Sequence, residues 1–123
     1  MKEIKAIVVG AAGKMGGRII HIMKDTPSIK LFRAVDLSFL KAMGMNIGDV
    51  VGLTQAGDAL LPVLKKDGGD VIINFSSPQA SIQSLEFAKE SGLAIVIGTT
   101  GLNAEQMNRV QDLSKSVRCV LAP

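Results

Sequence analysis

A glycine-rich segment, GAAGKMG, joins a short apolar run to the first amphipathic stretch of the chain. The run, residues 4–10, is mostly β-branched and apolar, which is typical of a strand buried on both faces of a parallel sheet. After it come Gly10, Gly13 and Gly16. In a strand–loop–helix unit such glycines permit a tight turn, close approach of the backbone to a diphosphate, and close helix packing, in that order. The spacing therefore predicts a loop that presents helix N-terminal amides to phosphate oxygens.

An acidic residue strengthens this interpretation. Residues 29–36 read as a second strand that ends on Asp36, about the expected 20 residues beyond the loop, where a carboxylate accepts hydrogens from a ribose. The same carboxylate repels a 2'-phosphate, and Leu37 follows it rather than an arginine, so the sequence predicts NADH over NADPH. Arg33 and Lys41 lie near enough in sequence to favour NADPH instead. The structural alternative is a solvated aspartate beside a simple glycine turn.

The first helix is expected to start at Met15 and to end before Pro27. The period changes from two to 3.6 after the glycine loop, because apolar side chains then recur on one stripe and polar side chains, including His21, on the other. The expected apolar stripe consists of Met15, Ile19, Ile22 and Met23.

The rest of the chain alternates between strand and helix signals. Residues 37–57 have no sustained period and are expected to be irregular, and Asp58 is a candidate cap for a short helix through Lys66. Ser77 followed by Pro78 opens a helix to Ser91 that stops at Gly92, and Asn103 with Gln106 opens another whose Met107, Val110 and Leu113 share a face. Apolar runs at residues 71–75, 94–97 and 118–121 are the remaining expected strands.

This order predicts an α/β fold, a doubly wound parallel sheet of the Rossmann type, in one domain that covers residues 1–123. Hydrophobic residues make up 47% of the chain and charged residues 20%, the balance of a globular protein rather than a disordered one. The cations that give a net charge of +3 are scattered, and aromatic residues are 3% of the total, which argues against a nucleic-acid surface. No run approaches the roughly 20 apolar residues of a membrane span, so we expect a cytoplasmic protein, with its single cysteine, Cys119, a buried structural thiol.

Four motifs together suggest a family. They are VGAAGKMG at residues 9–16, VIINFSSP at 71–78, VIGTTGL at 96–102 and VLAP at 120–123. In order and spacing they resemble dihydrodipicolinate reductase over essentially the whole chain. The resemblance implies NAD(P)H-dependent reduction of a small dihydrodipicolinate-type substrate to tetrahydrodipicolinate in the diaminopimelate route to lysine. It also implies a homotetramer of two-domain subunits.

The resemblance also assigns cofactor contacts. The loop from Gly10 to Met15 would hold the pyrophosphate, Asp36 the adenosine ribose, and the segment after the fifth strand the nicotinamide end. The implied residues are Gly10, Ala11, Ala12, Gly13, Lys14, Met15, Asp36, Phe75, Gly98, Thr99, Thr100, Ala122 and Pro123, with Ser76 beside Phe75 at the cleft.

The predicted topology agrees with these positions independently. Ligands of open parallel sheets lie beyond the carboxyl ends of the strands, and five of the assigned residues are expected strand ends: Gly10, Asp36, Phe75, Gly98 and Ala122. Glycines at 98 and 101 would let backbone amides approach a flat carboxamide, while the hydroxyls of Thr99 and Thr100 can donate or accept hydrogen bonds.

Two features depart from the family's pattern. Asn74 stands where the family usually has aspartate, and Ser77 where some members carry arginine; each substitution affects the expected cofactor preference. The family's paired histidines, its lysine and its PSGT motif would follow Pro123, so the C-terminal catalytic and tetramerisation domain is expected to be absent from this chain. We therefore assign no catalytic residue and no metal ligand, and expect residues 1–123 alone to bind NADH weakly and to reduce nothing.

Individual residues and other protein classes remain as alternatives. His21 reads as an exposed helix residue rather than a general acid, and Lys14 fits phosphate attraction and a solvated cation equally well. A stand-alone NAD(H)-sensing regulator would bind the same ligand without chemistry. An S-adenosylmethionine methyltransferase also joins a glycine loop to a strand-end acid, but the GTTG segment counts against it. A purely structural domain is the remaining alternative.

Overall fold

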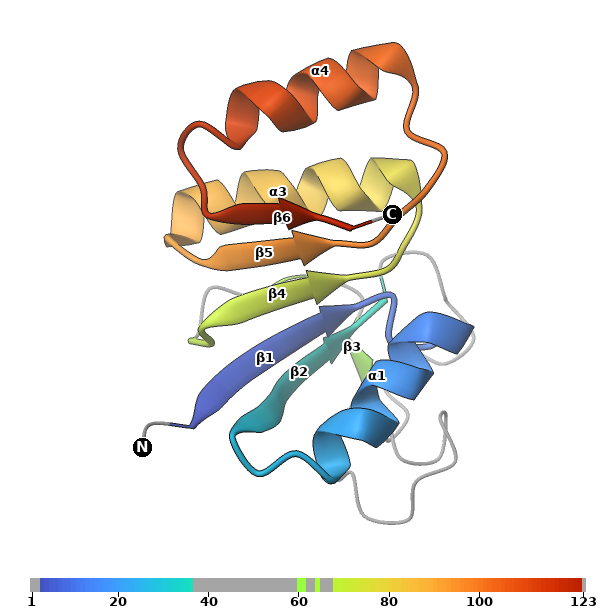
Figure 1. The fold of residues 1–123 in the computed structure, drawn as a ribbon, viewed down its shortest axis with the longest axis vertical. Helices are drawn as coiled ribbons and strands as arrows, with labels where there is room; N and C mark the ends of the chain where they lie inside the picture. The colour runs from blue at the N-terminus through green and yellow to red at the C-terminus, as the bar shows by residue number, and fades with distance from the viewer. Residues whose placement is uncertain (1–2, 37–59, 62–63, 65–67, 123) are drawn as a thin grey trace.

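The computed structural model describes residues 3–36, 60–61, 64 and 68–122, which build a six-stranded, entirely parallel sheet. The strand order is β3-β2-β1-β4-β5-β6, so β1 lies in the middle and the chain winds outward from it in both directions (Figure 1). The strands are β1 (Ile4–Val9), β2 (Ile29–Val35), β3 (Leu60–Leu61), β4 (Val71–Asn74), β5 (Ala94–Ile97) and β6 (Cys119–Leu121). This confirms the predicted doubly wound α/β fold.

Helices cover the sheet from both sides. They are α1 (Lys14–Lys24), α3 (Pro78–Ser91) and α4 (Ala104–Leu113). Alternate residues of β1 serve the two sides: Ala6 and Val8 pack in a cluster with Ile20 of α1, whereas Ile7 and Val9 pack in a second cluster with α3 and α4. Because both faces of β1 are buried, its sequence is continuously apolar after Lys5 rather than alternating.

The starts of α3 and α4 follow the sequence signals closely. The Ser77 hydroxyl accepts a hydrogen bond from the Ala80 amide at 3.1 Å and Pro78 occupies the first turn, while Gly92 ends α3 with a φ of 70°. Asn103 and Gln106 form the reciprocal capping box at the start of α4. Val110 and Leu113 are buried on the predicted face, with Met107 partly buried beside them.

The predicted apolar stripe of α1 is right at Met23 and in part at Ile19, which packs against the core, and wrong at Met15 and Ile22. The buried positions are Gly16, Gly17, Ile20 and Met23, whereas Ile22 is 65% exposed and Met15 47% exposed. Residues 16, 20 and 23 recur at the helical spacing of three to four and form the face that meets the sheet. That face carries the glycines because α1 lies so close to the loop before it that a Cβ on Gly16 would overlap the carbonyl oxygen of Gly10.

The short helix predicted from Asp58 is also wrong where the structure can test it. Leu60–Leu61 is a parallel strand, β3, which pairs with Ala34 and Val35 of β2. A strand partner distant in sequence has overridden local helix signals. The predicted irregular segment at 37–57 lies outside the described residues.

Cys119 in β6 is partly rather than fully buried, and this burial raises the pKa of its thiol above the ordinary value. In the part of the chain that the structure describes, no helix has the length and apolar character needed to cross a membrane.

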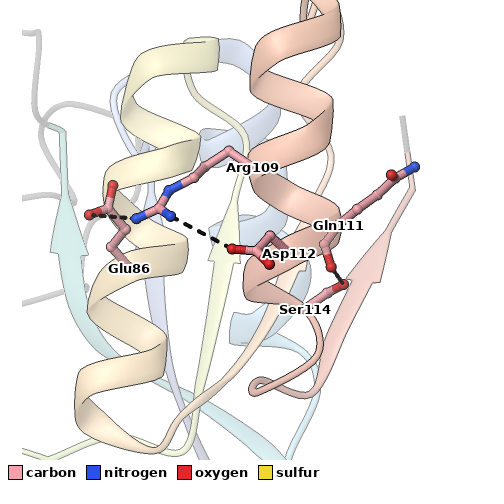
Figure 2. A network of polar contacts seen from close by, with 5 residues as sticks. All are labelled: Glu86, Arg109, Gln111, Asp112 and Ser114. Carbon is pink, nitrogen blue, oxygen red and sulfur yellow. Dashed lines mark hydrogen bonds and ion pairs between the residues drawn. The ribbon is translucent and has the colours of Figure 1, made fainter.

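The packing of α3 against α4 includes a surface ion-pair network (Figure 2). Arg109 of α4 lies 3.8 Å from the Glu86 carboxylate of α3 and 3.9 Å from Asp112 on its own helix. All three side chains are about half exposed or more, so these pairs contribute little to stability, and the buried Val110 and Leu113 hold the helix instead.

The corrected face of α1 leads to a stability test with two isoleucines of one helix. Ile20→Ala should lower the free energy of unfolding by about 2–5 kcal/mol, because it leaves a cavity in the core. Ile22→Ala, at an exposed position, should change it by less than about 0.5 kcal/mol. Urea unfolding followed by circular dichroism measures both, and a larger loss for Ile22→Ala than for Ile20→Ala would show that the predicted stripe, not the observed one, faces the sheet.

Candidate functional site

The carboxyl ends of the strands form one continuous edge (Figure 1). At four of them the residue directly after the strand donates its backbone N–H to the last residue of the neighbouring strand, at 2.8–3.0 Å. These bonds extend the parallel ladder by one residue each. They run from Gly10 to Val35, from Phe75 to Val9, from Gly98 to Asn74 and from Ala122 to Ile97.

The amides of the glycine loop divide into two groups. The amides of Gly10 and Ala11 both donate to the Val35 carbonyl. The Ala12 amide donates to the Asp36 carboxylate, and the Gly13 amide donates to the Gly10 carbonyl. The first helical bond of α1 is from Gly17 to Gly13 at 2.9 Å. The amides of residues 14–16 therefore precede the helical ladder and open onto the helix N-terminus, where an anion is favoured.

The three glycines of the loop have three different roles. Gly10 has a φ of 86°, and a Cβ there would overlap the carbonyl oxygen of Phe75, so this position needs glycine twice over. Gly16 needs it for the close packing of α1 described above. Gly13 has an ordinary φ of −82°, and its Cβ would meet only the Gly10 oxygen, at 3.4 Å. The tight turn at Gly10 and the close helix packing at Gly16 are thus explained by contacts within the protein, and the space beside Gly13 is left open.

Asp36 lies against this loop. It directly follows β2, is only 7% exposed, and accepts a hydrogen bond from the Ala12 amide at 3.3 Å through Oδ2. The structure therefore brings the acid and the glycine loop together, across 24 residues of sequence, as the spacing predicted.

Phe75, which follows β4, contacts the loops that follow β1 and β5. Its carbonyl lies against Gly10, and its ring lies where a Cβ on Gly98 would be. Gly98 therefore lacks a side chain for a structural reason, and its amide is already bonded within the sheet. Gly101, with a φ of 81°, has nothing within 4 Å of its Cβ direction and remains open for backbone approach.

The two threonines that follow differ in environment. Thr99 is 6% exposed, and its hydroxyl makes hydrogen bonds with Ser76, Ser81 and Asn74. Thr100 is exposed at the edge. The sequence singled out Asn74 of β4 only as a departure from the family's pattern, and the buried Ser81 and Ser84 of α3 were not predicted. A run of serines at helical spacing in an otherwise apolar segment was the available signal.

The remaining predicted residues lie around this edge or outside the described residues. Lys14, Met15 and Ala122 are exposed, and Pro123 lies outside the described part of the chain. His21 is exposed in the last turn of α1, about 10 Å along the helix from the glycine loop. Within the residues that the structure covers, no three His, Cys, Asp or Glu side chains gather as metal ligands would.

An open groove lies between α3 and α4. It is lined mainly by polar side chains, among them Gln79, Glu86, Asn103 and Arg109. None of the residues predicted to bind a cofactor lines it. The candidate site is therefore the strand edge with the glycine loop, where predicted residues from distant parts of the sequence come together.

A doubly wound sheet with a tight glycine loop before its first helix defines a Rossmann-type domain. The family model described as dihydrodipicolinate reductase, N-terminus, matches residues 4–123. The chain belongs to this family. The resemblance predicted from the four motifs is confirmed.

Known proteins agree with this assignment. The chain is 40% identical over 126 residues to the 4-hydroxy-tetrahydrodipicolinate reductase of Syntrophus aciditrophicus (strain SB), covering 98% of this chain and 46% of the relative. It therefore spans about half the length of the curated relatives that it matches.

Solved structures show the same fold at lower identity. A dihydrodipicolinate reductase from Paenisporosarcina sp. TG-14, solved with dipicolinate bound, is 20% identical with a TM-score of 0.67, over 98% of this chain and 47% of that one. A myo-inositol 2-dehydrogenase from Lactobacillus plantarum is 18% identical with a TM-score of 0.74, over 98% of this chain and 36% of that one.

The different roles of the loop glycines predict different stability effects. Gly16→Ala should lower the free energy of unfolding by about 1–3 kcal/mol, because the new methyl group forces α1 away from the loop. Gly13→Ser should leave it unchanged or slightly raised, because serine is a favoured N-cap and meets only ordinary contacts. Urea titration measures the free energy of unfolding of both variants. Equal losses would show that the motif requires glycine in the same way at each position, rather than for different reasons.

Proposed function

We propose that this chain is the NAD(P)H-binding domain of a 4-hydroxy-tetrahydrodipicolinate reductase. The observation that carries the proposal is the contact between the glycine loop and Asp36, at the carboxyl edge of a sheet whose sequence belongs to this family. A diphosphate and its ribose need a set of unpaired amides and a neighbouring carboxylate.

Each part of the edge has a proposed ligand group. The loop from Gly10 to Met15 takes the pyrophosphate, with the amides of residues 14–16 as its donors and the ammonium of Lys14 adding charge. Asp36 takes the adenosine ribose. Support for this comes from the order of the loop bonds, which use the amides of residues 10–13 within the protein and leave the helix N-terminus open.

The nicotinamide end is proposed to lie beyond β4, β5 and β6. Phe75 and the segment 98–100 would flank it, with Ala122 and Pro123 at the far side. The bound nicotinamide supplies the hydride, and the residues of this chain bind and orient it. Packing of the Phe75 ring on Gly98 supports a fixed, apolar wall at this place.

For the whole protein we propose reduction of a dihydrodipicolinate-type substrate to tetrahydrodipicolinate, in the cytoplasm and by a homotetramer. The proton donor and the substrate contacts would come from a second domain, since the chain spans 46% of its 40%-identical relative and carries one histidine, which lies away from the loop. An NAD(H)-sensing regulator without chemistry would use the same edge, but family membership favours the reductase.

The ribose contact is tested by cofactor preference. The protein should bind NADH more tightly than NADPH, and Asp36→Asn should weaken NADH binding by about tenfold, because it removes a charged acceptor. NADPH binding should stay the same or improve as repulsion of its 2'-phosphate is relieved. Fluorescence titration gives the four dissociation constants.

Asp25→Asn is the matched control, because it removes the same charge at the exposed far end of α1. Its NADH affinity should equal that of the unmodified protein. Tighter binding of NADPH by the unmodified protein would contradict the proposed preference.

The division between binding and catalysis is tested on residues 1–123 alone. This polypeptide should bind NADH and give no turnover, because its edge provides cofactor contacts only. Gly13→Ser should weaken the binding, since its side chain enters the open space beside the loop. Measurable reduction of substrate by these residues would overturn the assignment of catalysis to a second domain.

A further inference from the structure

A buried polar cluster lies directly beneath the proposed nicotinamide end. We call it the Asn74 cluster; it consists of Asn74, Ser76, Ser81, Ser84 and Thr99. Asn74, Ser81 and Ser84 are fully buried, and Thr99 is 6% exposed. Its members come from β4, from α3 and from the two loops that follow β4 and β5.

Asn74 uses both ends of its side-chain amide. Its Oδ1 accepts hydrogen bonds from the hydroxyls of Ser76 at 2.6 Å and Ser84 at 3.3 Å. Its Nδ2 donates to Ser81 at 2.7 Å and to Thr99 at 3.2 Å. The side chain therefore contacts both loops and α3 at once, which an apolar residue or a single hydroxyl cannot do.

Thr99 links the loop after β5 to the loop after β4. Its hydroxyl donates to the Ser76 carbonyl at 2.9 Å and lies 3.2 Å from the Ser76 amide, which donates to it. The hydroxyl of Ser81, which is on α3, lies 2.6 Å from the Thr99 hydroxyl. The loop after β5 is thus held against the loop after β4 by side-chain bonds, beyond the end of the sheet ladder.

From this geometry we infer that Asn74 is a positioning residue, which through Ser76 and Thr99 fixes the spacing of the two loops that hold the nicotinamide end. The inference rests on the proposed function. Asn74 itself is fully buried, so its effect on the ligand passes through the loops. The adenosine half of the site, at Asp36 and the N-terminus of α1, shares none of the hydrogen bonds of the Asn74 cluster.

The fold should survive removal of the Asn74 amide. Ser81 also bonds the Ser77 carbonyl at 2.8 Å, and Ser84 the Ala80 carbonyl at 2.9 Å, so both hydroxyls keep a backbone partner. Aspartate at this position should also connect both loops. It keeps the bond from the Ser76 hydroxyl and can accept from Thr99, whose hydroxyl then gives up the Ser76 carbonyl but still accepts from the Ser76 amide. Leucine, of similar shape, has no polar atom to offer.

The test compares NADH with ADP-ribose, which lacks the nicotinamide, in the protein at its natural length. The unmodified protein should bind NADH more tightly, and the ratio of the two dissociation constants measures the nicotinamide contribution. Asn74→Leu and Thr99→Val should reduce that ratio by about fivefold to tenfold, or to one, as expected for lost hydrogen bonds. Their affinity for ADP-ribose should change by less than about twofold.

Two further variants separate positioning from general stability. Asn74→Asp should restore the unmodified ratio. Ser84→Ala removes a buried hydroxyl that contacts Asn74 but neither loop, and it should leave the ratio unchanged even if the protein is less stable.

Two results would overturn the inference while leaving the proposed function intact. One is an unchanged ratio in Asn74→Leu and Thr99→Val, whether or not both affinities fall, and the other is equal affinities in the unmodified protein. Absence of binding to either ligand by the unmodified protein would overturn the proposed function and this inference with it.

Discussion

The contact of the Gly10 backbone with the carbonyl of Phe75 is the constraint on which the rest of the structure depends. It joins the loop after the central strand, β1, to the loop after its neighbour, β4, and it leaves no room for a side chain at Gly10. With the loop fixed there, α1 must turn back across β1 at short range, and only its glycine-bearing face fits. The same contact sets Phe75 where its ring can cover Gly98, so three crossovers are positioned by one close approach.

Hydrogen bonding along the edge then decides which groups can meet a ligand. The sheet takes the amides of Gly10, Phe75, Gly98 and Ala122, and the glycine loop closes on itself and on Asp36. Among the described residues, the beginning of α1, the backbone near Gly101 and the exposed Thr100 remain open. Charge and backbone dipoles thus concentrate at one half of the edge and neutral polar groups at the other, the distribution that a dinucleotide with one anionic and one neutral region requires.

The sequence predicted the elements with strong local signals and missed those set by distant partners. Ser77, Gly92 and the Asn103 capping box mark helix ends through bonds within a few residues, and these ends were predicted closely. The buried face of α1 was predicted only in part, because a count of apolar side chains gives no weight to Gly16. β3 was missed because β2, with which it pairs among the described strands, is distant in sequence, and the bond from Asn74 to Thr99 spans 25 residues that no local pattern connects.

The candidate edge is built largely from main-chain N–H and C=O groups, which every amino acid except proline supplies. Side chains can therefore be exchanged over most of the chain while the ladder and its final bonds stay in place. This accounts for the same architecture in a myo-inositol 2-dehydrogenase at 18% identity. It also means that evolutionary change of ligand preference on such a scaffold requires few substitutions, at the positions just past each strand, and no rebuilding of the framework beneath.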